Sequence, residues 1–546
     1  METTTGDSGT NGLASIRAPN STAVWRGVPI VGLSLLLISL VRTGWLSDDA
    51  YISFRTADNL LNGYGPVWNV GERVQSFTPP LWLALCTAAF GITGNVYYTA
   101  IALSVVVTLG FVFILVTRVA VSSRHLLVCF AVLLSSKAFI DYSTSGLENP
   151  LTHLLLLVFL WGWWCLRDDA RRLALLSLVA ALCMLNRLDL ILILAPPLAL
   201  ASWRLGVQAI RPVIVGTLPI VLWLAFATFY YGTPFPNTAY AKLSTALTTD
   251  IRLARGVDYL LRTLIFDPVT LPAIAVGLAA LVWSRCRTDW SIAAGLLLYF
   301  AYILYIGGDH MMGRFFTAPL VVAIAVLSRT EWMTTRARAY AGAALAVGLG
   351  LLAPWEPALL SGYGYSDANN WIHGRATRDP ADGGLYTLVR GIADERRFYE
   401  SAGLLEVGLK GSFGHMWRSD GEDLRRGGRQ VVVRGNIGLI GFYAGPEVHI
   451  IDELALSDPL LARLPGGDAE SRIGHLLRTV PDGYVQSVAT GTNLITNPDL
   501  AAYYAALREV VSGPLWSRTR LRTTVAFLAG RFDHYRLAYL ESVRAR

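Results

Sequence analysis

Long apolar runs separated by short polar loops fill the first 354 residues of the chain. A membrane-spanning helix needs about 20 predominantly apolar residues, and roughly 17 is the lower limit. By that measure the pattern predicts eleven transmembrane helices, over 26–45, 95–117, 124–140, 148–166, 171–187, 189–205, 211–231, 268–285, 290–307, 314–330 and 337–354. The run 80–92 is apolar too, but it is short and begins with a proline.

The composition indicates a polytopic membrane protein and excludes a soluble protein of ordinary make-up. Of the 546 residues, 53% are hydrophobic and only 16% are charged, and the mean hydropathy is +0.45. The net charge of +7 would suit a nucleic-acid-binding protein, but the arginines gather in short loops between apolar runs. That distribution is typical of the cytoplasmic loops of membrane proteins, where it sets the orientation of the chain, and it does not indicate a polyanionic partner.

The arginine-rich loops also predict the topology. Loops of this kind face the cytoplasm, and they lie at 118–124, 167–172, 204–211, 285–287 and 329–338. All five face one side only if an odd number of crossings separates Asp49 from Arg118, so 80–92 is predicted to be re-entrant or non-spanning. We therefore expect a multi-pass plasma-membrane protein with a cytoplasmic N-terminus and an extracytoplasmic, periplasmic C-terminus. The polar residues 1–25 are predicted to form a disordered cytoplasmic tail.

Two domains are predicted. Residues 26–354 form the transmembrane domain, with a first outer loop over 46–94. Residues 355–546 contain no apolar run of spanning length, and short β-branched runs at 430–433, 435–442 and 448–452 predict strands. Helical patterns lie at 383–398 and 499–511. This part is predicted to be a soluble, mixed α/β domain on the outer face.

Two adjacent carboxylates, Asp48 and Asp49, directly follow the first apolar run. Residues 49–62 have the spacing of an amphipathic interfacial helix, with Arg55 away from its apolar side and Gly63 as a stop. A structural interpretation is that Ser47 or Asp48 caps the N-terminus of the helix, and that acidic groups in its first turn favour the positive end of the helix dipole. A catalytic interpretation rests on the frequent functional use of ionisable groups at membrane boundaries. Consecutive helical side chains diverge by about 100°, so one carboxylate is expected to react and the other to position.

Further polar groups interrupt the apolar runs on the predicted outer side. Cations at this depth can clamp a lipid phosphate, and the candidate donor-phosphate ligands are Arg187, Lys242, His310 and Arg314. Carboxylates and amides match sugar hydroxyls, and the candidate sugar or acceptor ligands are Glu72, Gln75, Glu148, Asp189 and Asp309. For each cation alone, interfacial snorkelling is the simpler explanation. Their convergence with the carboxylate pair on one side favours a site.

Six motifs together resemble a known family. They are Asp48-Asp49-Ala50-Tyr51-Ile52, Gly146-Leu147-Glu148-Asn149-Pro150, Asn186-Arg187-Leu188-Asp189, Asn237-Thr238-Ala239-Tyr240-Ala241-Lys242, Gly308-Asp309-His310-Met311-Met312-Gly313-Arg314 and the stretch from Ile451 to Pro459. The set resembles the mycobacterial arabinofuranosyltransferase B family of cell-envelope enzymes, over a range from about residue 40 into the C-terminal domain.

The resemblance implies a GT-C-type glycosyltransferase whose donor is decaprenyl-phosphoryl-β-D-arabinofuranose. It implies transfer of arabinofuranose, through a β(1→2) linkage, to the non-reducing ends of arabinan in arabinogalactan and lipoarabinomannan. It also implies a catalytic acid in the first outer loop and a C-terminal domain able to hold glycan. The catalytic acid of the family maps onto Asp48 or Asp49, and the motif does not choose between them.

If donor and product are both β, the configuration is retained. A carboxylate acting only as general base would invert it, so Asp48 or Asp49 is expected to act as nucleophile or to stabilise an oxocarbenium-like centre. A divalent cation is an open alternative, because adjacent acids beside a phosphate suit a hard cation. The sequence leaves any metal ligand unknown.

Three rival functions stay open at this point. One is another polyprenyl-phosphate-sugar glycosyltransferase that uses mannose or a different pentose, which composition does not distinguish. A second is a transporter or flippase of lipid-linked sugars, although no repeated broken-helix signature marks two halves of the chain. A third is a non-enzymatic scaffold that binds glycan through its C-terminal domain.

Overall fold

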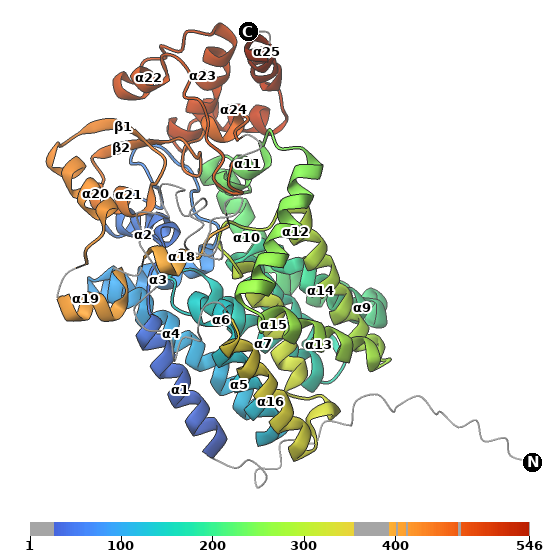
Figure 1. Cartoon of the computed structure of the whole chain (residues 1–546). Helices are drawn as coiled ribbons and strands as arrows, with labels where there is room; N and C mark the ends of the chain where they lie inside the picture. The colour runs from blue at the N-terminus through green and yellow to red at the C-terminus, as the bar shows by residue number, and fades with distance from the viewer. Residues whose placement is uncertain (1–26, 354–391, 400–401, 411–412, 468–470, 545–546) are drawn as a thin grey trace, which may run out of the picture.

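The computed structural model describes residues 27–353, 392–399, 402–410, 413–467 and 471–544 (Figure 1). The predicted tail over 1–25 and most of the predicted helix over 383–398 lie outside these ranges. In Figure 1 a bundle of long helices occupies the lower part, and the C-terminal residues cover its upper end.

The lower bundle is built from the apolar runs. Its helices and the short ones between them are α1 (Gly27–Thr43), α2 (Asp48–Leu61), α3 (Pro80–Thr93), α4 (Val96–Ile114), α5 (Ser123–Ser135), α6 (Lys137–Tyr142), α7 (Asn149–Cys165), α8 (Ala170–Asn186), α9 (Ile191–Leu205), α10 (Ile210–Tyr231), α11 (Asn237–Leu243), α12 (Thr249–Phe266), α13 (Thr270–Trp283), α14 (Arg287–Ile306), α15 (Thr317–Leu327) and α16 (Arg336–Leu351). The helix α15 is buried along its whole length, so it lies at the centre of the bundle.

Several of these helices can cross a membrane. Among the described residues, the stretches Val96–Val119, Leu188–Tyr231 and Arg287–Ile306 are long and apolar enough by themselves. Two helix pairs qualify only when joined across sharp bends, α1 with α2 at 83° and α12 with α13 at 105°, which raises the count to five. The chain is therefore a membrane protein by this measure, and the expected number of eleven crossings stays a prediction.

The first outer loop begins with the predicted amphipathic helix. The helix α2 starts where the Ser47 hydroxyl accepts the N–H of Ala50, and it ends before Gly63, whose φ of 83° suits glycine. Because α2 turns by 83° from α1, it lies across the end of that helix and does not continue it. The helix expected over 49–62 is confirmed, with each end within one residue, and its location at the membrane interface stays a prediction.

The C-terminal residues form a mostly helical cap around one small sheet. Its elements are α18 (Glu395–Phe398), α19 (Leu404–Lys410), α20 (Met416–Arg426), β1 (Gln430–Arg434), α21 (Gly438–Ala444), β2 (Val448–Asp452), α22 (Tyr484–Thr490), α23 (Pro498–Ser512), α24 (Arg518–Leu528) and α25 (Asp533–Arg544). The strands are parallel, with Gln430 opposite Val448. The predicted strands at 430–433 and 448–452 and the helix at 499–511 are confirmed.

The expected strand over 435–442 is wrong, because that segment contains the helix α21. Parallel strands need a crossover connection, and α21 supplies it between β1 and β2. A side chain at Gly438 would collide with the backbone of Asp48, and one at Gly441 with Trp68. The two glycines let α21 lie directly against α2 and the loop after it.

Arg55 anchors this contact, and its expected place on the polar side of α2 is wrong. Its side chain is 2% exposed. It donates hydrogen bonds to the carbonyl oxygens of Trp68, Gly441 and Val448 at 2.8, 2.6 and 2.8 Å. The guanidinium also lies 4.2 Å from the Trp68 ring centroid. One buried cation therefore joins α2, α21 and β2.

The cap and the first loop share hydrophobic clusters. Tyr51 and Phe54 of α2 and Trp82 of α3 lie in one cluster with Tyr399 and Leu439 of the cap. Ile52 and Trp68 lie in a second cluster with residues of α21, β1 and β2. The described C-terminal residues are thus packed on the first loop through apolar side chains, and the predicted domain boundary after 354 falls outside the described ranges.

Candidate active site

Asp48 and Asp49 occupy the first turn of α2, but their carboxylates have different surroundings. The Asp48 carboxylate accepts hydrogen bonds from the backbone N–H groups of Gly438 and Leu439, at 3.0 and 2.7 Å. Burial raises the pKa of Asp48 to about 7, the Leu439 hydrogen bond opposes that shift, and the charge of Asp49 adds to it. Asp48 therefore holds the start of α21 against α2.

Of the two carboxylates, Asp49 is the one without a partner among the described residues. Its side chain is half-buried, and among the described residues no group donates a hydrogen bond to it or forms an ion pair with it. It nevertheless lies within electrostatic range of Arg314 and of Glu395. An uncommitted carboxylate beside buried charges is the kind of group that a substrate can engage.

Beneath it, Glu148 joins the two arginines that the sequence singled out. The Glu148 carboxylate is 3% exposed and lies 3.1 Å from Arg314 Nη2 and 3.6 Å from Arg187 Nη1. Both arginines are nearly buried as well, with side chains 11% and 8% exposed. Two cations share the Glu148 carboxylate here, so it holds the two guanidinium groups close together.

Asp189 fixes the second arginine. Its Oδ2 lies 2.6 Å from Arg187 Nη2 and accepts a hydrogen bond from the Tyr299 hydroxyl at 2.9 Å. The Arg187 guanidinium also lies 4.7 Å from the ring centroid of Phe315. Asp189 and Tyr299 thereby orient Arg187, and they occupy two of its donors.

Asp309, His310 and Arg314 come from one tight loop between α14 and α15. Gly308 has a φ of 74°, and a Cβ there would lie 2.5 Å from the Tyr259 ring. The Tyr259 hydroxyl donates to the Met311 carbonyl at 3.0 Å and accepts the Phe315 N–H at 3.2 Å. Glycine is needed at 308 because of its positive φ and because of the close approach of the Tyr259 ring. Tyr259, a residue of α12, holds the loop in place.

Within the loop, Asp309 and His310 lie against each other. His310 Nδ1 is 3.0 Å from Asp309 Oδ1, and Arg314 Nη1 is 3.7 Å from Asp309 Oδ2. Burial would raise the pKa of Asp309, but His310 and Arg314 outweigh it and hold that pKa well below its usual range. Asp309 is thus a carboxylate at neutral pH, and it offsets part of the positive charge.

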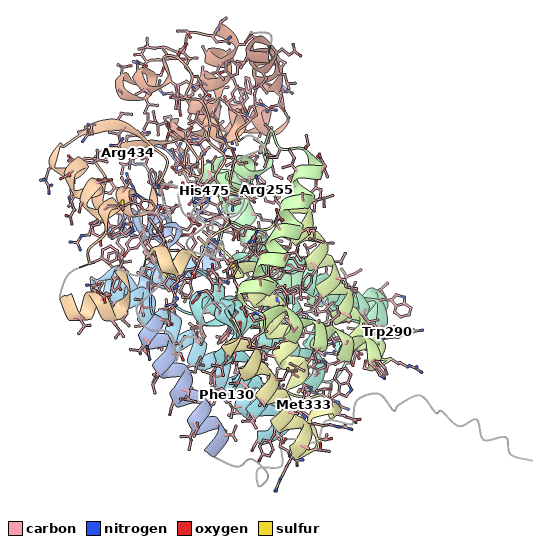
Figure 2. The ribbon with its side chains drawn as sticks, viewed as in Figure 1. Phe130, Arg255, Trp290, Met333, Arg434 and His475 are labelled. Atoms are coloured by element: carbon pink, nitrogen blue, oxygen red, sulfur yellow. The ribbon has the colours of Figure 1, made fainter. Side chains whose placement is uncertain are left out.

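The cap contributes three residues that the sequence analysis missed. Glu395 lies 3.8 Å from His310 Nε2 and 3.2 Å from Arg472 Nη2, and the His475 ring centroid is 4.2 Å from that of His310. His475 is labelled in Figure 2, where it lies between the cap and the bundle. Burial, opposed by His310 and Arg472 and reinforced by Asp49, raises the pKa of Glu395. Only the charged run 394–397 hinted at this role in the sequence.

Lys242 lies at the rim of this group. It is an exposed residue in the last turn of α11, and a Cβ at Gly474 would come within 3.9 Å of its Cε. Among the described residues it forms no hydrogen bond or ion pair. Its charge helps to lower the pKa values of Asp309 and of His475, so it faces the same space.

The structure separates Glu72 and Gln75 from the residues above. The Gln75 side chain is 3% exposed and donates to the Phe77 carbonyl at 3.2 Å. Glu72 accepts a hydrogen bond from Asn69 at 2.9 Å and lies 3.8 Å from His449 Nε2. It lines a cleft on the cap, described further below, and not the space around Asp49.

No group of three or more His, Cys, Asp or Glu residues in the described ranges is arranged to hold a metal ion. Several polar atoms around the loop lack a hydrogen-bond partner, and they are Asp309 Oδ2, His310 Nδ1, Arg314 Nε and His475 Nδ1. Buried polar atoms of this kind are normally paired. Arg314 Nε is a donor and Asp309 Oδ2 is an acceptor, so a polar ligand that carries both kinds of group can pair with them.

A bundle of membrane helices under a polar cap, with this charged group between them, is the arrangement of the GT-C fold. The solved structure of ArnT from Cupriavidus metallidurans bound to undecaprenyl phosphate has that fold, with a TM-score of 0.50 at 12% identity over 80% of this chain and 88% of that one.

More particularly, the chain is similar to the terminal β-(1→2)-arabinofuranosyltransferase of Mycobacterium tuberculosis, 27% identical over 527 residues that cover 80% of this chain and 81% of the relative. The Corynebacterium glutamicum protein of the same name is 26% identical over 341 residues, covering 52% of this chain and 48% of the relative. No family model matches the chain. The resemblance expected from the six motifs is confirmed, and both relatives are named as enzymes.

Proposed function

We propose that the protein transfers arabinofuranose from decaprenyl-phosphoryl-β-D-arabinofuranose to the termini of arabinan in arabinogalactan or lipoarabinomannan, forming β(1→2) linkages. The names of the two relatives support the sugar and the linkage. The fold shared with a protein bound to undecaprenyl phosphate supports a polyprenyl-phosphate donor. The observation that carries the proposal to the site is the Asp49 carboxylate, which has no partner among the described residues and lies within electrostatic range of Arg314.

The donor phosphate is assigned to the cations. Arg314 and Arg187 are nearly buried and are held by Glu148 and Asp189, while His310 lies beside Asp309 and Lys242 is exposed. A phosphate that leaves gains charge, so cations that bind it more tightly at that moment lower the barrier. In this proposal Glu148 and Asp189 act by orienting the arginines, and Asp309 by fixing His310.

The catalytic carboxylate in this proposal is Asp49, and Asp48 positions it. The bond between the anomeric carbon and the phosphate oxygen breaks, and its electron pair leaves with decaprenyl phosphate. A bond forms between that carbon and an acceptor hydroxyl oxygen, whose proton passes to the departing phosphate. Asp49 stabilises the oxocarbenium-like centre or bonds to it transiently, which allows the configuration to be retained.

The same proposal includes the finer topology. The chain crosses the plasma membrane eleven times, the N-terminus is cytoplasmic, and 355–546 form a periplasmic glycan-binding domain after the transmembrane domain 26–354. The support is the distribution of arginines over the loops. It places Asp49, the loop 307–314 and the cap on one side of the membrane.

The test is transfer by purified protein in detergent or nanodiscs. Radiolabelled decaprenyl-phosphoryl-arabinose and a synthetic oligoarabinoside are expected to give a product one residue longer, with a β(1→2) linkage by NMR. Decaprenyl-phosphoryl-mannose serves as the competing donor, and its preferential use would favour the alternative glycosyltransferase. Movement of intact lipid-linked sugar across a vesicle membrane without transfer would favour a transporter. Full activity after exhaustive chelation would remove a divalent cation from the scheme.

A further inference from the structure

A cleft of about 740 Å³ lies on the cap, apart from the candidate active site. Its walls come from the loop after α2, from β1 and β2, and from α22 and α23 (Figure 1). The side chains that matter for its chemistry are Tyr64, Glu72, Arg429, His449, Tyr504 and Arg508. The volume falls within the range of about 300–1,000 Å³ that is usual for small-molecule sites.

The lining suits a neutral, hydroxyl-rich ligand. Tyr64 stands at the lip with 48% of its surface exposed, so its ring is open to stack on the apolar face of a sugar. Glu72 and His449 lie deeper, 3.8 Å apart, with side chains only 13% and 22% exposed. Arginine side chains and an acid, Glu447, line the same cleft, so no single sign of charge dominates.

The protonation of Glu72 and His449 also suits a neutral, hydroxyl-rich ligand. Burial raises the pKa of Glu72 to about 7, against the opposing hydrogen bond from Asn69. Burial, together with the charge of Arg55, lowers the pKa of His449 to about 4. A neutral imidazole and a carboxyl group that shares protons near neutrality can each donate to and accept from hydroxyl groups.

The position of the cleft relates it to Asp49. Asp49 lies in the first turn of α2, whereas Tyr64 follows its last turn, and its N–H donates to the Asn59 carbonyl at 2.9 Å. At about 1.5 Å per residue, the helix separates the two by roughly 20 Å. One ligand can touch both places only if it is a chain of several linked sugars.

We infer that this cleft is a remote subsite for the acceptor oligosaccharide, which holds inner sugar residues while the chain end lies at Asp49. The inference rests on the proposed function for the identity of the acceptor. A peptide strand is the less favoured occupant, because α22 packs beside β1 and the lining is formed by side chains and not by a free sheet edge.

The experiment compares two arginines at opposite ends of β1. Arg429 lines the cleft, and Arg434 is exposed outside it (Figure 2). Full-length wild type, Tyr64→Ala, Arg429→Ala and the control Arg434→Ala are assayed with a disaccharide and an octasaccharide acceptor. In the two cleft variants the KM for the octasaccharide should rise about five- to tenfold, while kcat/KM for the disaccharide stays unchanged. Arg434→Ala should match wild type with both acceptors.

Calorimetry without donor gives a readout that does not need catalysis. Octasaccharide should bind the wild type and Arg434→Ala and bind Tyr64→Ala at least about fivefold more weakly. If wild type transfers no arabinose but the cleft variants still lose binding, the proposed function fails and the subsite stands. Equal octasaccharide binding and equal KM in all four proteins overturns the subsite, as does binding of an unstructured peptide in place of the octasaccharide.

Discussion

The Asp48 carboxylate accepts the backbone N–H of Leu439 at 2.7 Å, across 391 residues of sequence. A second N–H, from Gly438, reaches the same carboxylate. The first of the two adjacent acids is therefore committed to joining the first outer loop to the cap. The second, Asp49, has no such partner among the described residues, and this difference predicts separate and measurable consequences for the two substitutions.

The first prediction separates these two acids. Asp49→Asn should lower transfer at least about 100-fold, because a carboxylate that stabilises the reacting carbon is lost. Its stability should stay within about 0.5 kcal/mol of wild type, since no partner is removed. Asp48→Ala should instead cost about 1–3 kcal/mol by leaving two N–H groups unpaired. Radiolabel transfer measures the activity of each variant, and thermal unfolding measures its stability. Full activity of well-folded Asp49→Asn would contradict the assignment of Asp49 as the catalytic carboxylate.

A second prediction concerns the donor phosphate. Lys242→Gln should raise the KM for the lipid donor about tenfold, as expected for one lost phosphate contact of ~1.4 kcal/mol. The unfolding temperature should not change, because the side chain is exposed and unpaired among the described residues. Arg434→Gln, at an exposed position of β1, is a useful control. The KM for the lipid donor is measured from initial rates at several donor concentrations. An unaltered KM in Lys242→Gln would show that Lys242 does not contact the donor.

The sequence predicted elements well wherever local pattern decides them. The helix α2, both strands and α23 follow from periodicity and turn residues in their own segments. The helix α21 could not be found this way, because its segment of Ile, Leu and Phe between glycines has the composition of a strand. Its helical state depends on the Asp48 carboxylate at its first N–H groups and on the crossover between parallel strands.

The site was predictable to a similar extent. The motifs identified Arg187, Arg314, Asp309 and His310, and the side chains of these residues lie together in the structure. Glu395 and His475 were missed, because both reach the loop by long-range folding of the cap, and the charged run that contains Glu395 does not by itself indicate a site. Conversely, Gln75 was singled out for its residue type, although its side chain is buried and bonded within its own loop.

A third prediction concerns pH. The pKa of Glu72 is raised from 4.5 to about 7 in the folded protein, so its contribution to stability is full below about pH 4.5 and is lost as the pH rises through 7. Glu72→Gln cannot ionise, and its free energy of unfolding should therefore fall less than that of wild type between pH 5 and 8. Because Asp452 and Asp458 also have pKa values of about 7, the difference between variant and wild type is the quantity to measure.

A fourth prediction concerns the buried cation of α2. Arg55→Met should destabilise the protein by at least about 3 kcal/mol, because three carbonyl oxygens lose a charged donor together. Arg434→Ala, which removes an exposed arginine of β1, should change stability by no more than about 0.5 kcal/mol. Thermal unfolding in detergent compares them, and equal midpoints for the two variants would show that the Arg55 contacts are dispensable.

The contacts made by Arg55 and Asp48 also determine when the first outer loop can complete its folding during synthesis. Their partners at 438–448 lie 386 to 393 residues further along the chain. At about 5–20 residues per second, the ribosome needs roughly 20 to 80 seconds to make that stretch. During this interval the Arg55 guanidinium lacks two of its three carbonyl partners and stays hydrated, and the apolar side chains of α2 that pack on the cap are uncovered. The first loop can therefore reach its final packing only after the cap has been made.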